Sequence, residues 1–513
     1  KEPVAGHSTE MEKASISDLA HNNAIAISKG ISATALTLLE DADQFNKSKL
    51  NLKKGRIINN TISKSNLIKL VENNNIETII TAFPDMYGRL MGKRFDSQFF
   101  IKNVLDEGTH ACDYLLGVDI DMEPISGYKI TSWEKGYGDF HLKLDLNTIR
   151  IADWLYKTVI ILCDLEKNHK PVNESPREIL KKQIKIAEKK GYKIKLASEL
   201  EFYVFDNSYQ DAKEKSYIGL NPSNRFREDY SLLNTSSEEA LMSKLRNSLT
   251  LSGIEVECTK GEWDLGQQEI NVKYSDPLDM ADKHVIIKQA AKEIAYQNDM
   301  SITFMSKWNE KSAGSSMHIH LSLWDSKNTK NLFYDKTVKN DLKSSDNFQW
   351  FLGGWMKYSP DIFMFYSPYP TSFKRFVSES FAPTKISWSI DNRTSTFRIV
   401  GEQNNLRIEC RIPGADANPY LAFAASIAAG INGIENKITP PEMTTGDSYT
   451  NSALVSCPDN VDKGLKYFND SKFISNHLGQ EVKDHYSHFF ETEKFAFERI
   501  VTDWEKNRYF ERI

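Results

Sequence analysis

Ionisable side chains recur at every second position in three short segments of this chain, and a fourth segment places them around a glycine. The segments span residues 198–205, 317–323, 406–412 and 262–270. Because the side chains of a β-strand alternate between its two faces, the ionisable residues share one face and the apolar residues share the other. One such segment alone would be read as a surface strand with a solvated face. Four together predict a polar cavity inside a curved antiparallel sheet.

The polar faces carry the residue types that phosphoryl transfer from a nucleotide requires. They comprise Glu199, Glu201, Glu262, Glu269 and Glu409, the pair His318 and His320, and the pair Arg407 and Arg411. Clustered carboxylates repel one another, and an oxygen-rich site with one imidazole suits Mg²⁺ or Mn²⁺. Arginines beside such a site match the oxygens of a phosphate group. The sequence has no G-x-x-x-x-G-K-[ST] motif, so a P-loop enzyme is excluded.

The chain of 513 residues is long enough for roughly two to four domains, or for one large domain with a smaller partner. Residues 1–55 are expected to form an extension with one amphipathic helix, because its apolar residues keep a spacing of three or four. A mixed α and β domain is predicted over residues 56–170, and a larger domain over residues 171–513.

Local patterns predict the elements that position the ionisable residues. In the smaller domain we expect a helix and several strands over residues 63–72, 78–83, 89–95, 114–118, 140–144 and 158–163. The Gly-rich loop at 132–139 is either a surface turn with packing aromatic residues or a loop presented to a ligand. Beyond it, helices are expected over residues 177–190, 236–252, 277–298, 344–356, 418–436 and 461–475.

The overall charge and composition exclude several classes of protein. Lys and Arg number 65 against 70 Asp and Glu, which does not resemble the basic surface of a nucleic-acid-binding protein. No apolar run is long enough to predict a membrane span, and the first residues lack the apolar core of a secretory signal. Five cysteines without a C-x-x-C pair favour a reducing compartment, so a cytoplasmic location is expected.

From about Thr78 to its C-terminus the chain resembles the glutamine synthetase family. The motifs that carry the resemblance are Glu199-x-Glu201, Glu262 to Glu269, Gly314 to Ser322, Asn392-Arg393-Thr394, Arg407-x-Glu409-x-Arg411 and Asn418 to Ile434. The resemblance implies an α+β fold. A small β-grasp-like N-terminal domain would precede a large catalytic domain with a curved antiparallel sheet surrounded by helices.

Matched position by position, the resemblance implies one metal site at Glu201, Glu262 and Glu269, and another at Glu199, His318 and Glu409. It implies about two or three Mg²⁺ or Mn²⁺ ions in each active site, with ATP as co-substrate. The positions that match substrate-binding residues are Gly314, Arg375, Phe381 and Arg411. Those that match nucleotide-binding residues are Glu257, His320, Ser322, Arg393, Arg398 and Arg407. Arg393 and Arg411 are the expected catalytic arginines.

The reaction implied by the resemblance has two steps. The γ-carboxylate of glutamate attacks the γ-phosphate of ATP to give γ-glutamyl phosphate and ADP, and ammonium or an organic amine then displaces phosphate. Water must be excluded, because it would hydrolyse the acyl phosphate. The resemblance also implies a ring-type homo-oligomer with active sites between subunits, in which the loop Trp133–Asp139 or its surroundings completes a neighbour's site.

The sequence departs from ammonia-using members of the family at the amine site. Their flap glutamate corresponds to Phe381, and their His-His pair before a metal glutamate corresponds to Lys260-Gly261. Asp113 is only a loose match for the aspartate of the neighbouring subunit's ammonium site. The run Phe381-Ala382-Pro383 is instead similar to the branch that glutamylates larger amines such as polyamines.

Three interpretations stay open at this point. A γ-glutamyl-amine ligase would keep every metal ligand and alter the amine site, as this sequence does. A true glutamine synthetase would need another acid, such as Glu379, in place of the flap glutamate. A non-catalytic structural relative would be expected to have lost metal or arginine residues, and none is lost.

Overall fold

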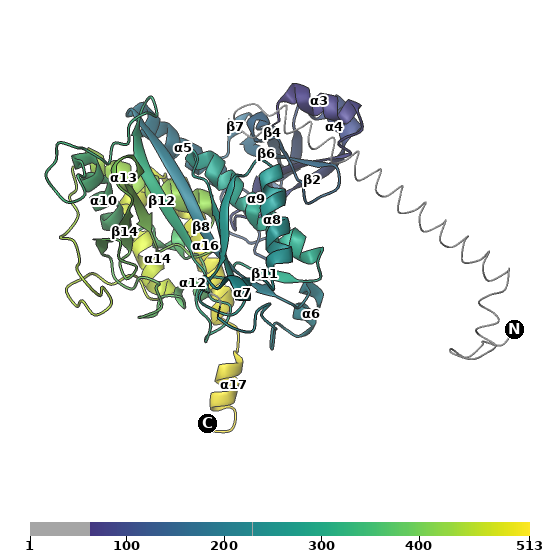
Figure 1. Cartoon of the computed structure of the whole chain (residues 1–513). Coiled ribbons are helices and arrows are strands. Elements are labelled where there is room, and N and C mark those ends of the chain that lie inside the picture. Colours follow the sequence, from purple (N-terminus) through teal and green to yellow (C-terminus); the bar gives the residue numbers. More distant parts are fainter. Residues whose placement is uncertain (1–61, 228) are drawn as a thin grey trace, which may run out of the picture.

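The computed structural model describes residues 62–227 and 229–513, which form two β-sheets surrounded by helices (Figure 1). The amphipathic helix expected within residues 1–55 lies outside the described residues. Within the described part of the chain, no helix combines the length and the apolar character that crossing a bilayer requires.

The first sheet has seven strands, and its longest strands run in the order β2-β1-β6-β4-β3. Its strands are β1 (Thr78–Pro84), β2 (Leu90–Asp96), β3 (Thr109–Cys112), β4 (Asp139–Leu144), β5 (Arg150–Ile151), β6 (Thr158–Lys167) and β7 (Lys170–Pro171). The hairpin of β1 and β2 confirms the prediction, and β1 also pairs in parallel with β6. Helices α3 (Lys64–Glu72) and α4 (Ser97–Asn103) pack on this sheet through Leu67 and Phe100.

One strand predicted in this part of the chain is wrong. Residues 114–118 are not a strand, because Asp113–Leu116 forms a 3-10 helix, η1. The side chain of Asp113 in that helix is buried and accepts a hydrogen bond from the Thr131 hydroxyl at 2.6 Å.

The second sheet has eight strands, of which seven follow the order β13-β14-β15-β12-β8-β10-β9 while β11 pairs with β8. They are β8 (Tyr192–Phe205), β9 (Val256–Gly261), β10 (Gln267–Val272), β11 (Ser301–Thr303), β12 (Met317–Asp325), β13 (Trp388–Ile390), β14 (Phe397–Val400) and β15 (Arg407–Cys410). The antiparallel sheet expected from the sequence is confirmed except at one edge. There β13 pairs in parallel with β14, so the sheet is mixed.

The helices of the larger part of the chain include all those that the sequence predicts. They are α5 (Pro176–Lys189), α6 (Tyr209–Glu214), α7 (Leu232–Thr235), α8 (Glu239–Leu251), α9 (Pro277–Tyr296), α10 (Asp346–Tyr358), α11 (Phe363–Tyr366), α12 (Pro370–Phe373), α13 (Pro419–Glu435), α14 (Val461–Asp470), α15 (Lys472–His477), α16 (Gln480–Glu498) and α17 (Asp503–Tyr509). The helix expected over 461–475 is two helices, because the Ser471 hydroxyl caps a new one at the Ile474 amide.

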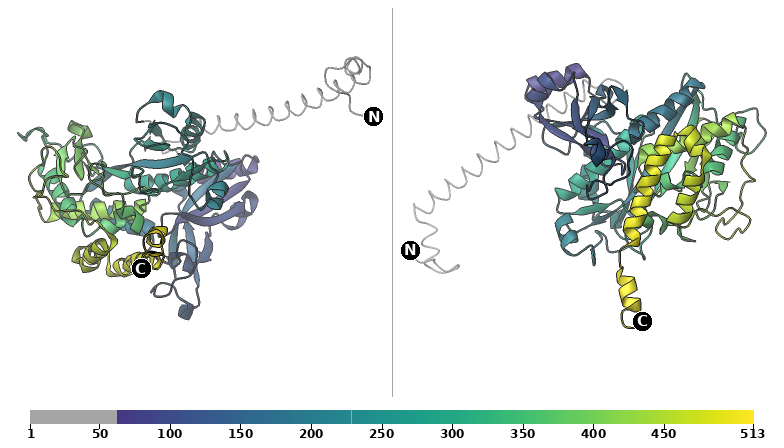
Figure 2. Two further views of the ribbon diagram at one scale, coloured as in Figure 1. Left: turned by 90° about the horizontal axis from the view of Figure 1, so that it is seen from below. Right: turned by 180° about the vertical axis from the view of Figure 1, so that it is seen from behind.

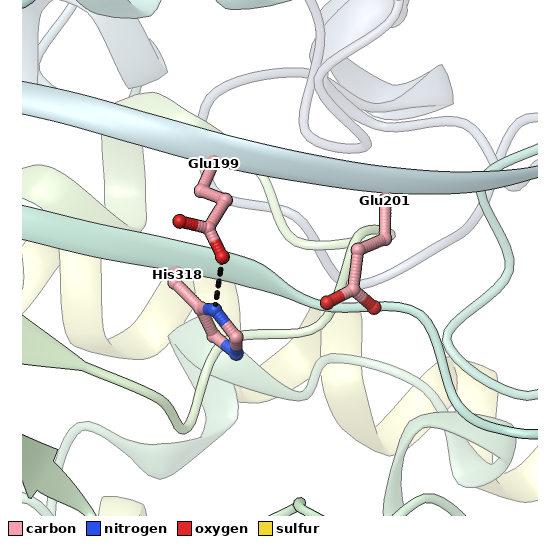
Figure 3. A group of neighbouring side chains, drawn as sticks. All are labelled: Glu199, Glu201 and His318. Atoms are coloured by element: carbon pink, nitrogen blue, oxygen red, sulfur yellow. Dashed lines mark hydrogen bonds and ion pairs between the residues drawn. The ribbon is translucent and has the colours of Figure 1, made fainter. Parts of the chain in front are cut away.

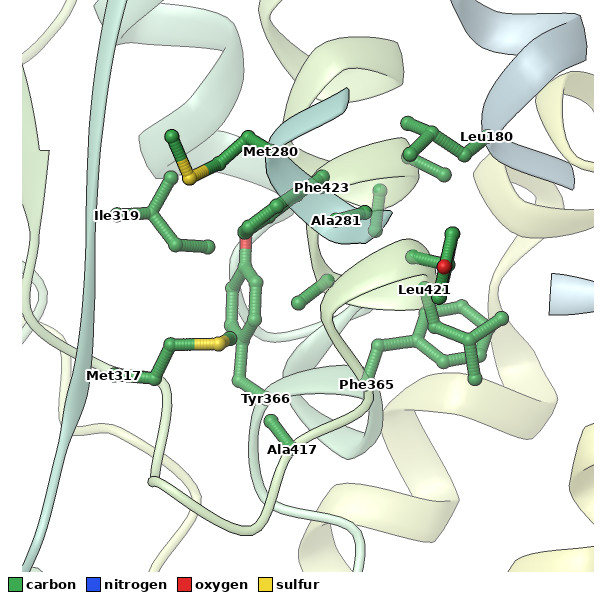
Figure 4. Close-up of a cluster of buried hydrophobic side chains, with 14 of the residues drawn as sticks. Leu180, Met280, Ala281, Met317, Ile319, Phe365, Tyr366, Ala417, Leu421 and Phe423 are labelled. Carbon is green, nitrogen blue, oxygen red and sulfur yellow. The ribbon is translucent and has the colours of Figure 1, made fainter. Parts of the chain in front are cut away.

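The main core lies between the second sheet and its helices. Figure 4 shows Met317 and Ile319 of β12 facing Met280 of α9, Tyr366 of α11 and Phe423 of α13. All five side chains are fully buried, as expected for the apolar face of an alternating strand. The opposite face of β12 therefore carries its histidines away from this core.

The smaller sheet is held against the rest of the chain by polar contacts. Asn418 caps α13 through the Tyr420 amide, and its side-chain amide donates to the Asp85 and Met86 carbonyls at 3.1 Å each. The Tyr87 hydroxyl donates to Glu493 of α16, and the rear view in Figure 2 shows the C-terminal helices beside the first sheet. The domain boundary near residue 170 stays a prediction, since residues on both sides share one buried cluster.

Candidate active site

The register of the second sheet brings the predicted acidic residues together. Glu199 and Glu201 extend from the same face of β8 toward His318 of β12 (Figure 3). His318 lies opposite Glu199 in the pairing of β12 with β8, and Glu269 lies opposite Glu201 in the pairing of β10 with β8. The site is therefore built by cross-strand neighbours rather than by neighbours in sequence.

A first group that could hold a cation consists of Glu201, Glu262 and Glu269, which offer carboxylate oxygens within 4.8 Å of one another. Glu262 follows β9 in the turn to β10, where Gly266 adopts a positive φ of 66°. Burial and the neighbouring carboxylates raise the pKa of Glu201 to about 8 and that of Glu269 to about 11. Burial and mutual repulsion thus disfavour three ionised carboxylates in this group, and the donor set fits Mg²⁺ or Mn²⁺.

A second group consists of Glu199, Glu201 and His318, again with candidate ligand atoms within 4.8 Å. The imidazoles of His318 and His320 donate to Glu199 at 2.8 and 3.3 Å. Burial opposes ionisation of Glu199, but these hydrogen bonds hold its pKa well below the usual range.

Glu409 lies beside this second group and is engaged by arginines. Its carboxylate is 3.7 Å from Nδ1 of His318, and it pairs with Arg398 at 2.9 Å and with Arg411. Burial alone would raise its pKa, but Arg411 and the two histidines lower it to about 2. The role of Glu409 as a metal ligand stays a prediction, as do the other ligand assignments.

Lys260 introduces a cation into the first acidic group. Its ammonium pairs with Glu262 and lies 4.5 Å from the centre of the Tyr230 ring. Burial would lower the pKa of Lys260, but Glu269 and Glu262 raise it above the usual value. This is the position at which the sequence departs from the His-His pair of the family.

Gly314 and Arg375, the residues expected to bind the α-carboxylate of glutamate, are in contact. A Cβ atom on Gly314 would overlap with the Arg375 side chain, so glycine is required for this approach. Arg375 donates to the Ile412 carbonyl, and burial lowers its pKa to about 10. Among the described residues, the buried Nε atoms of Arg375 and Arg411 have no hydrogen-bonding partner. Both arginines can therefore still bind an anionic ligand.

Phe381 lies next to Arg411, whose Nη2 donates to the Phe381 carbonyl at 3.4 Å. The Phe381 side chain is 56% exposed, so it is open to an approaching substrate. The backbone of Phe381 has a positive φ of 60°, which is uncommon for a bulky residue.

A cavity of about 340 Å³ extends from Glu199. Its lining includes four of the six predicted nucleotide-binding residues, namely Glu257, His320, Ser322 and Arg407. Arg398 is instead paired with Glu409 and Asp391, and Arg393 is exposed between β13 and β14. The cavity also contains Trp324, which the sequence prediction missed and which donates to the Ser322 hydroxyl at 2.9 Å. The alternation that selected His318, His320 and Ser322 continues to Trp324 and could have identified it.

Comparison with known proteins identifies the class. The family model described as the glutamine synthetase catalytic domain matches residues 173–509 of this sequence. The chain therefore belongs to the glutamine synthetase family of carbon–nitrogen ligases. The enzyme class predicted from the sequence is thereby confirmed.

Two relatives of this chain are named as ligases that join glutamate to an organic amine. A γ-glutamylethanolamide synthetase of Streptomyces coelicolor is 41% identical over 86% of this chain and 95% of the relative. A glutamate–isopropylamine ligase of a Pseudomonas species is 34% identical over 88% of this chain and 99% of the relative. The structure of GmaS without ligand has the same fold, with a TM-score of 0.75 at 23% identity, covering 86% of this chain and 98% of that chain.

Proposed function

We propose that this protein is an ATP-dependent ligase that joins the γ-carboxylate of glutamate to an organic amine. The observation that carries the proposal is Phe381 beside an otherwise complete set of acidic and arginine residues. The names of the two amine-ligating relatives support the same reaction.

Each group of residues in the site has a separate role in this reaction. Arg375 and Gly314 bind the α-carboxylate of glutamate, and Arg411 orients its γ-carboxylate toward the nucleotide. The γ-carboxylate oxygen forms a bond to the γ-phosphorus of ATP as the bond to ADP breaks, and the amine nitrogen then displaces phosphate from the acyl carbon. Divalent cations held by Glu201, Glu262 and Glu269, and by Glu199, His318 and Glu409, would neutralise the charge of the phosphate groups.

Phe381 favours an organic amine over ammonium for a physical reason. Ammonium is strongly hydrated, and a site that captures it must replace water with acidic groups that also accept its proton. A cation–π contact with Phe381 would recover only about 0.5–2 kcal/mol of the lost hydration. Methylene groups that pack against the ring contribute roughly 0.8 kcal/mol each to binding. An alkyl amine therefore gains binding free energy at Phe381, whereas ammonium loses hydration there.

A true glutamine synthetase is the second candidate, because Glu379 is exposed two residues before Phe381 on the same loop. Glu379 also has a positive φ, of 62°. A rearrangement of this loop could carry its carboxylate to the position of the missing flap glutamate.

Phosphate release with glutamate, ATP and Mg²⁺ across ammonium, monoamines, diamines and amino alcohols tests the proposal. We expect at least one organic amine to exceed ammonium in kcat/KM. In Phe381→Glu the ratio of organic amine to ammonium should fall about tenfold, a change of roughly 1.4 kcal/mol. Glu379→Gln is the matched control and should leave the ratio unchanged. Equal or better use of ammonium by the wild type, with loss of that activity in Glu379→Gln, would establish glutamine synthesis instead.

We further infer a homo-oligomer with shared active sites. The loop Trp133–Asp139 supports this inference, because the Trp133 ring is 70% exposed and rests on Tyr137 with ring centres 4.9 Å apart. An aromatic pair held at the surface in this way fits a contact with a neighbouring subunit.

A further inference from the structure

Asp416 joins the two segments that carry the expected ligands of the α-carboxylate of glutamate. One ligand, Gly314, lies in the connection between β11 and β12, and the other, Arg375, lies just after α12. Asp416 lies in a third segment, the connection between β15 and α13, and its side chain is half-buried. It belongs to neither of the acidic groups described above.

Ser306 links Asp416 to the connection that carries Gly314. The Ser306 hydroxyl donates to Oδ1 of Asp416 at 2.6 Å, and its amide donates to Oδ2 at 3.3 Å. The Ser306 carbonyl accepts from the amide of Ser315 at 2.9 Å, directly after Gly314. A Cβ atom on Gly414 would overlap with the Ser306 hydroxyl, so glycine is required for this approach. The backbone position of Gly314 thus depends on the contact with Asp416.

Ser372 links Asp416 to the segment that carries Arg375. The buried Ser372 hydroxyl accepts from the Tyr369 amide at 3.2 Å and donates to Oδ2 of Asp416 at 2.8 Å. The amide of Arg375 donates to the Ser372 carbonyl at 3.4 Å, so the two residues share one turn. Asp416 therefore fixes the turn from which the Arg375 side chain extends.

Asp416 also supports the charge of Arg375. Burial lowers the pKa of Arg375, whereas Glu201 and Asp416 oppose that fall. Burial raises the pKa of Asp416, whereas its two serine donors and Lys288 of α9 oppose that rise. Lys288 also donates to the backbone beside Asp416, at the Ala415 carbonyl, at 2.9 Å. The carboxylate thus combines two hydrogen-bonded supports with a favourable charge.

We propose that Asp416 is a positioning residue of the glutamate site, which holds the Gly314 backbone and the Arg375 guanidinium at the spacing that the α-carboxylate requires. This inference rests on the proposed function and adds a residue to its glutamate site. Asparagine cannot replace Asp416, because an amide accepts hydrogen bonds only at its oxygen, and one serine would lose its acceptor.

Steady-state kinetics with the amine that the wild type uses best, ammonium included, test the proposal. In Asp416→Asn we expect KM for glutamate to rise at least about tenfold while kcat changes little, because an anchor engaged equally in the ground and transition states affects KM. The KM for ATP should not change.

Ser372→Ala removes one support and leaves Asp416 in place, so KM for glutamate should rise about threefold, as expected for one hydrogen bond. The double variant should raise KM by less than the product of the two single effects, because both substitutions act on the same contact.

Asp361→Asn is the matched control, because Asp361 likewise accepts from a buried serine, Ser471 at the start of α15, at 2.6 Å. It should leave KM for glutamate at the wild-type value.

An unchanged KM for glutamate in Asp416→Asn would overturn the proposal. So would equal rises in KM for glutamate and for ATP, because Asp416 would then support the fold as a whole. If Asp416→Asn does not fold, Ser372→Ala decides by the same criterion. Failure of the proposed function is read separately, as a preference of the wild type for ammonium over every organic amine, on which the KM for glutamate does not depend.

Discussion

The ion pair of Lys260 with Glu262 partly neutralises the first acidic group, Glu201, Glu262 and Glu269, before a divalent cation binds. Because Lys260 pairs with one oxygen of Glu262, a cation that binds this carboxylate must tolerate the lysine ammonium or displace it. The lysine therefore competes with Mg²⁺ for one ligand while limiting repulsion among three carboxylates. Its contact with Tyr230 gives the displaced ammonium an alternative partner.

We predict opposite effects of two substitutions in this group. Lys260→Met removes the competitor and should lower, several-fold, the Mg²⁺ concentration that gives half of the maximal rise in melting temperature. Glu269→Gln removes one unit of ligand charge, so it should raise that concentration at least about tenfold, or roughly 1.4 kcal/mol, and abolish turnover without unfolding the protein.

Lys273→Met is the control for this pair, because Lys273 forms a surface ion pair with Glu255. Exposed pairs of this kind contribute only about 0–1 kcal/mol, so the Mg²⁺ response should not change. Wild-type turnover in Glu269→Gln would show that Glu269 is not a metal ligand.

At the scale of single residues, the sequence predicts what lies on regular strands and misses what lies on connections. Glu199, Glu201 and His318 follow a period of two, so their common face could be read directly. The connection between α13 and α14, residues 436–460, has no periodicity, and its hydrogen bonds to residues 384–388 arise only from tertiary pairing. The pairing of Arg398 with Glu409 likewise depends on the register of β14 with β15.

At the scale of elements, a strong hydrophobic periodicity predicts that a helix or strand exists, and which of the two it is, better than it predicts where the element begins and ends. The strands around residues 198–205 and 317–323 are confirmed as parts of β8 and β12. The segment 262–270 is a turn followed by β10 rather than one strand, and Gly266 was the signal for that bend. Residues 114–118 misled the prediction because a short apolar run does not distinguish a strand from a helical turn.

The contact between α10 and α13 gives a prediction at this scale. A Cβ atom on Gly354 would overlap with the Ala429 carbonyl oxygen and with Cα of Gly433, so the two backbones touch. Gly354→Ala should destabilise the fold by about 1–3 kcal/mol through overpacking, measured as a lower midpoint of urea unfolding. Lys357→Ala, on the exposed side of the same helix, should stay within about 0.5 kcal/mol of wild type. Equal midpoints for both variants would show that the helices can separate without loss.

At the scale of the whole molecule, α17 projects from the body at the C-terminal end (Figure 1). The helix and the residues just after it carry exposed large apolar side chains. Trp504 is 61% exposed, Phe510 85% and Ile513 97%. Exposed large apolar side chains on and just after a projecting helix are typical of a surface that another protein covers. The occupant consistent with the proposed homo-oligomer is a second copy of this chain.

We therefore predict that Trp504→Glu combined with Phe510→Glu lowers the sedimentation coefficient of the assembly while the melting temperature of the monomer fold is retained. Charges placed in an apolar interface are costly to desolvate. Lys506→Ala changes a polar residue of the same helix and should sediment like the wild type. An active wild-type monomer, or an unchanged assembly in the double variant, would contradict the prediction.

The acidic site draws on β8, β10, β12 and β15, which are neighbours in the sheet but are separated along the chain. During synthesis Glu199 and Glu201 leave the ribosome long before Glu409 and Arg411. At about 5–20 residues per second, the carboxylates of β8 wait roughly 10–40 seconds for Glu409 and Arg411, which complete the site. Until β15 is made, β12 presents an unpaired edge, which is the kind of surface that chaperones protect. The timing of translation therefore limits when the acidic groups are first joined by Glu409 and Arg411 into the complete site.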